Sequence, residues 1–217
     1  MDEPIRVVIA DDHPIVRKGL RATLEQEEGF QVVGEAGDGD AALALIRKLA
    51  PHVAVLDINM PGRDGFAVAR EMRNLKLKTN IIFLTLHADE DMFRAALEIG
   101  GKGYLLKDSA MQEIAVGVRA VAAGQFYLSA AMAPHLLEQK RAAEPSPRNP
   151  ILAQLTLSER RILALIAEGK SSKEIGAEIA IHYRTVENHR TNICRKLNIE
   201  GANALLRFAL QNKDGLT

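Results

Sequence analysis

The sequence is poor in cysteine, in long apolar runs and in net charge, and each absence excludes a class of protein. Cys194 is the only cysteine among 217 residues, so no internal disulfide can form and a reducing compartment is expected. No apolar run approaches the roughly 18 residues of a membrane span, and the N-terminus has no apolar signal segment. The 28 lysines and arginines are balanced by 28 aspartates and glutamates. We expect a soluble cytoplasmic protein with no membrane partner.

The balanced total conceals an uneven distribution of charge. Residues 1–137 hold 15 basic and 19 acidic side chains, whereas residues 151–217 hold 10 and 7. An acidic half suits a metal or phosphate site, and a basic half suits a polyanion. Between the halves, residues 138–150 contain three prolines and no apolar periodicity, which is typical of a linker. Residues 130–137 before it read as a bridging helix.

Strand-like and helix-like segments alternate in the first half. Short apolar runs lie at residues 5–9, 31–35, 53–57, 81–85 and 103–107. Helical patterns follow them, starting near Pro14, Asp38, Phe66, Asp89 and Met111. This alternation predicts an α/β fold, a doubly wound parallel sheet with helices on both faces.

Polar residues follow four of these strands. Asp11 and Asp12 end the first, and Asp57, Thr85 and Lys107 end three others. In a doubly wound sheet these strand ends meet at one rim. Crowded carboxylates repel one another, and a bound divalent cation relieves that repulsion. Because the ligands are all oxygen atoms and few in number, Mg²⁺ is the expected cation. A hydroxyl and a lysine beside them suit an added phosphoryl group on a carboxylate nucleophile. Each residue alone is more often a cap or a solvated charge, so the prediction rests on the joint pattern.

After residue 150 the pattern is helical throughout. Thr156 with Glu159, and Ser171 with Glu174, fit capping boxes at the starts of two helices. A third helix runs to Leu197, and a fourth runs from about Ala202 to Gln211. Two helices joined by a short turn in a small basic unit indicate a helix-turn-helix. On composition alone, the third helix is equally well explained as an amphipathic surface helix.

Residues 7–14 (VVIADDHP), 56–61 (LDINMP) and 103–108 (GYLLKD) resemble the motifs of two-component receiver domains. The resemblance implies a flavodoxin-like, five-stranded fold in which Asp57 accepts a phosphoryl group from a sensor histidine kinase. Thr85 and Lys107 would contact that group, and Tyr104 would be an aromatic switch. The implied Mg²⁺ ligands are Asp11, Asp12, Asp57 and the backbone carbonyl of Asn59. Asp108 stands where the family usually has proline, and Asn59 and His87 stand where the family tunes loss of the phosphoryl group.

Residues 155–160 (LTLSER), 165–176 (LIAEGKSSKEIG), 185–189 (TVENH) and 193–197 (ICRKL) are similar to the LuxR-type helix-turn-helix of the NarL/FixJ family. The resemblance implies binding of double-stranded DNA at an inverted repeat by a phosphorylated homodimer paired through the last helix, with RNA polymerase as a further partner. Glu187 replaces a frequent lysine, and His182 a frequent serine cap. The candidate DNA contacts are Lys173, Arg184, Thr185, Glu187, Asn188, His189, Thr191 and Arg195.

These inferences predict a receiver domain over 1–123, a bridging helix and linker over 124–150, and an all-α helix-turn-helix domain over 151–217. The predicted function is that of a response regulator transcription factor. The protein is expected not to be an enzyme beyond self-catalysed phosphoryl transfer to, and hydrolysis from, Asp57. Two alternatives stay open: a Mg²⁺-dependent phosphatase with an aspartyl nucleophile, and an interaction module with no role on DNA.

Overall fold

The computed structural model describes residues 3–86, 88–132, 151–179, 181, 183–201 and 203–213. The chain divides into two compact units, Met1–Ala133 and Pro134–Thr217, which are described separately below. The predicted linker, most of the predicted helix 130–137, and His87, His182 and Ala202 lie outside the described residues. Among the residues described, none of the helices is both long enough and apolar enough to traverse a bilayer.

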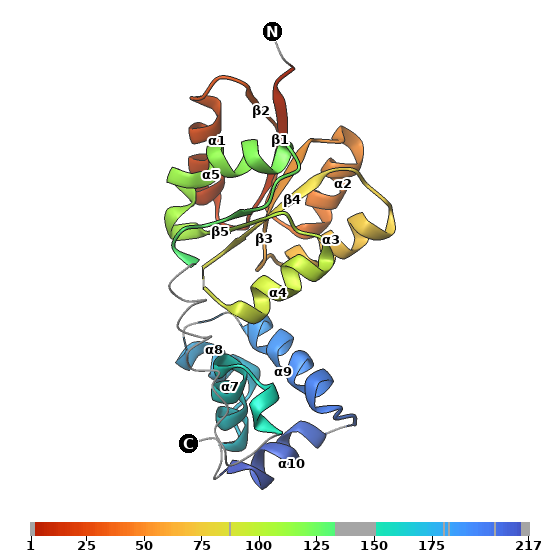
Figure 1. Cartoon of the computed structure of the whole chain (residues 1–217), viewed down its shortest axis with the longest axis vertical. Helices are drawn as coiled ribbons and strands as arrows, with labels where there is room; N and C mark the ends of the chain where they lie inside the picture. Colours follow the sequence, from red (N-terminus) through yellow and green to blue (C-terminus); the bar gives the residue numbers. More distant parts are fainter. Residues whose placement is uncertain are drawn as a thin grey trace. The chain divides into compact units, whose positions relative to one another are not determined.

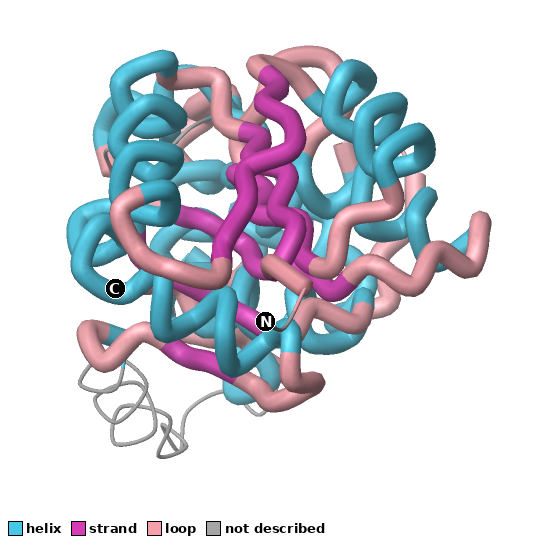
Figure 2. The backbone as a smooth tube through the Cα atoms, turned by 90° about the horizontal axis from the view of Figure 1, so that it is seen from above, coloured by secondary structure: helices cyan, strands magenta, loops and turns pink. Residues whose placement is uncertain are grey.

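The first unit is built on a parallel sheet of six strands in the order β2-β1-β3-β4-β5-β6. The predicted doubly wound α/β fold is confirmed, and the sheet runs between layers of helices (Figure 2). The central strands are buried apolar runs, since both of their faces are covered. The strands are β1 (Ile5–Ala10), β2 (Phe30–Ala36), β3 (Val53–Asp57), β4 (Asn80–Thr85), β5 (Gly103–Leu106) and β6 (Tyr127–Leu128).

Five helices cover the two faces of this sheet. The helices α1 (Pro14–Glu25) and α5 (Lys107–Ala122) pack together on one face (Figure 1). The other face carries α2 (Gly39–Leu49), α3 (Gly65–Asn74) and α4 (Glu90–Ile99). Pro14 opens α1, where its missing N–H costs nothing. The carboxylates of Asp38, Asp64 and Asp89 cap α2, α3 and α4 by accepting backbone N–H groups.

The end of the sheet differs from the five-stranded prediction. A sixth strand, β6, pairs with β5, and the backbone N–H of Ser129 donates to the carbonyl of Tyr104 at 2.9 Å. Two residues are too few to show an alternating pattern, so the sequence analysis missed β6. Lys107 is also not the last residue of a strand: β5 ends at Leu106 and α5 begins at Lys107, four residues before its predicted start. The sheet therefore extends past the boundary placed at residue 123.

The second unit consists of helices, as predicted. A short 3₁₀ turn (Leu152–Gln154) precedes α7 (Leu157–Ala167), α8 (Ser172–Glu178), α9 (Tyr183–Leu197) and α10 (Ala204–Gln211). Both capping boxes are present: Thr156 and Glu159 exchange hydrogen bonds at 2.9 and 3.3 Å, and Ser171 and Glu174 at 2.8 and 3.4 Å. All four helices contribute to one apolar core.

The turn between α8 and α9 depends on one glycine. The backbone N–H of Ile181 donates to the carbonyl of Gly176 at 2.9 Å. A Cβ at Gly176 would lie 2.6 Å from the carbonyl oxygen of Ile181, which is closer than any side chain tolerates. Gly176 thus lets the chain turn tightly into α9, and α8 and α9 form the predicted helix-turn-helix.

Candidate functional site

The strand order brings four separate parts of the sequence to the carboxyl ends of β1, β3, β4 and β5. Asp11 directly follows β1, Asp57 ends β3, Thr85 ends β4, and Lys107 opens α5 after β5. The sheet order reverses between β1 and β3, and such a switch point is where open α/β sheets bind ligands. The fold therefore brings these residues to the same edge of the sheet, as the sequence predicted.

Lys107 joins two of the carboxylates. Its ammonium Nζ lies 2.7 Å from Oδ2 of Asp11 and 2.8 Å from Oδ2 of Asp57, and all three side chains are buried. Burial alone would lower the pKa of Lys107, but the carboxylates of Asp57 and Asp11 outweigh it and raise that pKa. Lys107 thus supplies a fixed positive charge to the two carboxylates at the carboxyl ends of β1 and β3.

Asp57 is an uncommonly basic carboxylate. Burial raises the pKa of Asp57 from 3.8 to about 6; Lys107 opposes that rise, and the charge of Asp11 adds to it. The backbone N–H of Asn59 donates to Oδ1 of Asp57 at 3.1 Å and also favours the charged form. At neutral pH the carboxylate is ionised and poorly solvated, the condition in which an oxygen nucleophile is most reactive.

The acidic pocket also contains Asp12 and His13. One ligand atom from each of Asp11, Asp12, His13 and Asp57 lies within 4.8 Å of the others. Nδ1 of His13 lies 2.6 Å from Oδ1 of Asp12 and 3.2 Å from Oδ1 of Asp11. Three carboxylates so close together are the donor set of a hard divalent cation, so Asp11, Asp12 and Asp57 fit Mg²⁺. The sequence analysis did not single out His13; its position directly after the aspartate pair was the one signal of its place here.

Thr85 and Tyr104 form the opposite side of the site. Thr85 is buried at the end of β4, and the buried ring of Tyr104 packs edge-on against Phe93 with centroids 5.4 Å apart. Burial raises the pKa of the Tyr104 phenol well above its usual value; Asp89 adds to the rise and Thr85 opposes it. The phenol of Tyr104 therefore stays protonated. It lies on the side of β5 that faces Thr85.

The backbone after Asp57 depends on Gly65, a glycine that the sequence analysis did not single out. A Cβ at Gly65 would lie 2.3 Å from the carbonyl oxygen of Asp57. The N–H of Gly65 also donates to the carbonyl of Ile58 at 3.0 Å. Gly65 thus allows the first turn of α3 to pack directly against the strand end that carries the acidic residue.

In the second unit, α9 carries the predicted recognition surface. Val186 and Ile193 are buried in the core, and Leu197 packs against it. At about 100° per residue, Arg184, Asn188, Thr191 and Arg195 fall on the opposite face, with Glu187 beside them. This set, the α9 stripe (Arg184, Glu187, Asn188, Thr191 and Arg195), combines exposed and half-exposed polar side chains suited to base edges and phosphates.

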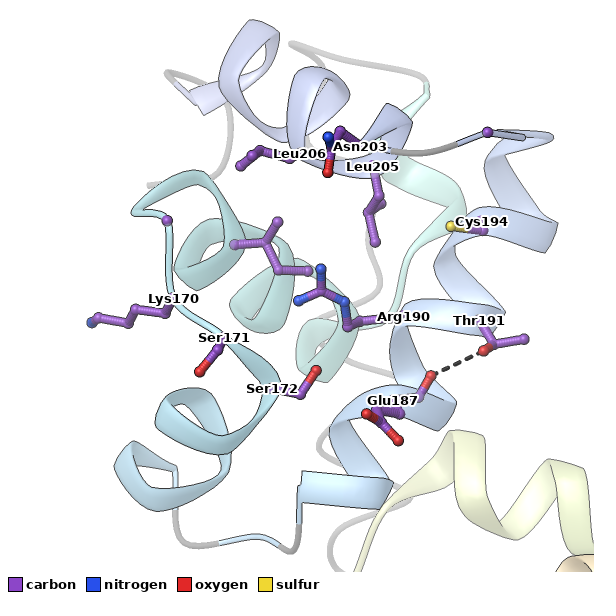
Figure 3. Close-up of a pocket in the computed structure, with 13 residues that line it drawn as sticks. Lys170, Ser171, Ser172, Glu187, Arg190, Thr191, Cys194, Asn203, Leu205 and Leu206 are labelled. Atoms are coloured by element: carbon purple, nitrogen blue, oxygen red, sulfur yellow. Dashed lines mark hydrogen bonds between the residues drawn. The ribbon is translucent and has the colours of Figure 1, made fainter.

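The other predicted DNA residues lie beside this stripe. Thr185 and His189, one turn apart on a flank of α9, are both buried, unlike the predicted exposed DNA contacts, whereas Lys173 is exposed in the first turn of α8. Within the stripe, the hydroxyl of Thr191 donates to the carbonyl of Glu187 at 3.0 Å, so only its lone pairs are open to a base (Figure 3). Cys194 packs against the core as expected, and burial raises the pKa of its thiol.

Comparison with known proteins gives a family for each of the two units. Residues 7–119 match the family described as response regulator receiver domain, and residues 153–209 match bacterial regulatory proteins, luxR family. The transcriptional regulatory protein LiaR of Bacillus subtilis is 38% identical over 209 residues, which cover 96% of this chain and 98% of LiaR.

Solved structures show the same relationship. The receiver domain of the putative response regulator NarL from Mycobacterium tuberculosis is 43% identical with a TM-score of 0.56, over 57% of this chain and 100% of that domain. The response regulator RcsB in complex with DNA is 31% identical with a TM-score of 0.61, over 96% of this chain and 98% of RcsB.

A receiver-type acidic pocket on a doubly wound sheet, followed by a helix-turn-helix, defines a DNA-binding response regulator that acts in transcription. The chain belongs to the NarL/FixJ family of these regulators, which carry a LuxR-type helix-turn-helix.

Proposed function

We propose that phosphorylation of Asp57 by a sensor histidine kinase controls dimerisation and DNA binding by this regulator. The observation that carries the proposal is the Lys107 ammonium held 2.7 Å from Asp11 and 2.8 Å from Asp57. An oxygen of Asp57 attacks phosphorus, and the bond from phosphorus to the phosphohistidine nitrogen of the kinase breaks. Kinase and chromosomal DNA are cytoplasmic partners, which supports a cytoplasmic location.

Each residue of the pocket has a distinct role in this proposal. Asp11, Asp12, Asp57 and the Asn59 carbonyl would hold Mg²⁺, which when bound offsets negative charge on the phosphoryl oxygens. Lys107 supplies a second, permanent positive charge to the same oxygens. The Thr85 hydroxyl donates to a phosphoryl oxygen, and the buried Tyr104 follows Thr85 as the switch. Hydrolysis of the acyl phosphate by water returns Asp57 to a carboxylate.

In the proposed dimer, α10 pairs across a two-fold axis so that two α9 helices read an inverted repeat. The sequence analysis assigned this surface to the last helix, whose large apolar residues are Leu205, Leu206, Phe208 and Leu210. Leu205 belongs to the apolar core, which removes it from the surface, whereas Leu210 is 54% exposed. The proposed contact therefore centres on Leu210, with the partly exposed Leu206 one turn away on the same face.

Acetyl phosphate with Mg²⁺ tests the trigger. Wild type should gain the mass of one phosphoryl group and bind a DNA site, selected from random duplexes, more tightly, whereas Asp57→Ala should do neither. Asp108→Ala is the matched control, because Asp108 is an exposed aspartate one residue after Lys107. Equal gains in DNA affinity for wild type and Asp57→Ala would show that Asp57 is not the phosphoacceptor.

The phosphatase alternative makes a different prediction in the same assay. An aspartyl phosphatase would need a second carboxylate as acid and base close to the nucleophile. Asn59 stands two residues after Asp57 and contacts it through a backbone N–H rather than a carboxylate. Continuous turnover of an aryl phosphate would favour the phosphatase, whereas a single labelling of Asp57 favours the regulator.

A further inference from the structure

The second unit contains a cavity between α7, α8, α9 and the start of α10. Its volume is about 770 Å³, and Ser171, Ser172, Glu187, Arg190, Cys194 and Leu206 are among its lining residues (Figure 3). We propose that this α8–α9 cavity receives a phosphodiester of the DNA backbone, held by Arg190 and Ser172. The proposal rests on the DNA-binding function argued above and adds two residues that are not among the candidate DNA contacts named from the sequence.

Arg190 supplies a positive charge that has no acidic partner among the residues the structure describes. Figure 3 shows its side chain extending from α9 across the cavity, on the side where Ser172 lies. Within the described part of the chain, neither Arg190 nor Ser172 has a hydrogen-bond or ion-pair partner. A half-exposed guanidinium and a hydroxyl on facing helices are donors suited to a phosphate oxygen.

Two neighbouring polar side chains, Lys170 and Ser171, are already engaged. Nζ of Lys170 lies 2.6 Å from a carboxylate oxygen of Glu168 and 2.6 Å from one of Glu178. The hydroxyl of Ser171 donates to Glu174 at 2.7 Å and accepts the Glu174 N–H as part of the capping box. Among the cationic and hydroxyl donors that line the cavity, this leaves Arg190 and Ser172 for an anion; the Glu187 carboxylate and the Asn203 amide line it too.

The position of the cavity favours the DNA backbone as the source of the anion. Glu187 and Thr191 line the cavity and also belong to the α9 stripe, so the cavity opens along one flank of the recognition surface. A major groove of about 12 Å just admits a helix, so phosphates lie along both flanks of that helix. The first helix of a helix-turn-helix crosses the backbone, and Ser172 opens α8. One phosphate can thus be reached from both helices.

Binding of the full-length protein to random-sequence duplex, measured by fluorescence anisotropy over a range of salt concentrations, tests the proposal. Arg190→Gln should lose about five- to tenfold in affinity near 0.1 M salt and reduce the salt slope by about one unit. Arg190→Lys should keep the slope, since the charge remains. Ser172→Ala should lose about two- to threefold with an unchanged slope, because it removes a neutral donor.

Two further variants separate charge in the cavity from charge elsewhere and from folding. Arg161→Gln, at an exposed arginine of α7, is the matched control and should match wild type in affinity and salt slope. Ser172→Asp places a carboxylate beside Arg190 at a helix start that tolerates acidic residues, so it should fold and lose about tenfold or more in affinity.

The outcomes keep the two proposals distinct. If Arg190→Gln and Ser172→Asp both keep the salt slope and the DNA affinity of wild type, the cavity assignment is wrong, although DNA binding itself stands. Failure of wild type to bind any duplex would instead overturn the proposed function. Inorganic phosphate is the remaining arm: if millimolar phosphate stabilises wild type against heat but not Arg190→Gln, while both bind DNA alike, the site takes a free anion and the DNA assignment is wrong.

Discussion

At the scale of single residues, the buried charge of Asp57 links stability to pH. The pKa of Asp57 is about 6 in the folded protein against 3.8 unfolded, so ionisation disfavours the folded state. This contribution to stability is fully present below pH 3.8 and is lost as the pH rises through about 6. Without metal, Asp57→Asn should therefore exceed wild type by about 1–3 kcal/mol at pH 8, and the difference should shrink towards pH 4.

Urea unfolding in EDTA at several pH values measures this difference. Asp108→Asn, at an exposed position, should show no pH-dependent difference from wild type. A variant Asp57→Asn that is less stable than wild type at pH 8 would mean that Lys107 outweighs burial. Added Mg²⁺ should raise the free energy of unfolding of wild type only, because the variant lacks one carboxylate ligand.

Substitution of Lys107 should lower the stability of the fold at pH 8, whereas substitution of Asp57 should raise it. Removal of Lys107 leaves Asp11 and Asp57 buried without a counter-charge, so Lys107→Met should cost about 3–5 kcal/mol at pH 8 in EDTA. Lys102→Met, at the other end of β5, is the control, because Lys102 has no ion pair in the described residues. A small and equal loss in both variants would show that the Lys107 pairs contribute little to folding.

At the scale of elements, the close contact between α3 and β3 predicts a packing effect on phosphorylation. In Gly65→Ala the new Cβ would lie 2.3 Å from the Asp57 carbonyl oxygen, so the strand end must shift. The variant should lose about 1–3 kcal/mol of stability and phosphorylate more slowly from acetyl phosphate. Gly37→Ala should behave as wild type, because its nearest neighbour is the Arg17 guanidinium at 3.5 Å. Wild-type labelling in Gly65→Ala would show that the contact has no part in placing Asp57.

The α9 stripe predicts which side chain reads sequence. Asn188 lies opposite the buried Val186 and Ile193, so Asn188→Ala should cost about 1–3 kcal/mol on the selected site and little on random duplex. Competition binding on both duplexes measures the difference. Arg161→Ala, at an exposed position of α7 outside the stripe, is the control. Equal losses on both duplexes would make Asn188 a phosphate contact.

Elements with strong local signals were predictable, and short or context-dependent ones were not. Asp38 and the two capping boxes were recognised because capping needs only residues three apart. The limits of β5 and the existence of β6 were missed, because pairing to a neighbouring strand defines them. The convergence of Asp11, Asp57 and Lys107 followed from strand order, but their distances and the raised pKa of Asp57 depend on burial that no sequence pattern records.

At the scale of the whole molecule, pairing through α10 predicts how the oligomeric state responds to a surface change. Leu210→Glu should leave the acetyl-phosphate-treated protein monomeric in sedimentation, because a charge at the proposed contact opposes association. Its affinity should fall on an inverted repeat but not on a single half-site. Gln211→Glu introduces the same charge at the adjacent exposed position and should still dimerise. A dimer of Leu210→Glu would move the interface away from α10.

The sixth strand has a practical consequence for dissecting the protein. A fragment that stops at residue 123 would lack Tyr127–Leu128, and the outer N–H and C=O groups of β5 would be left unpaired. Exposed groups of that kind template strand addition between molecules. Such a fragment should therefore aggregate or exchange strands between molecules in solution. A fragment that continues through Met132 keeps β6 paired with β5 and should stay monomeric under the same conditions.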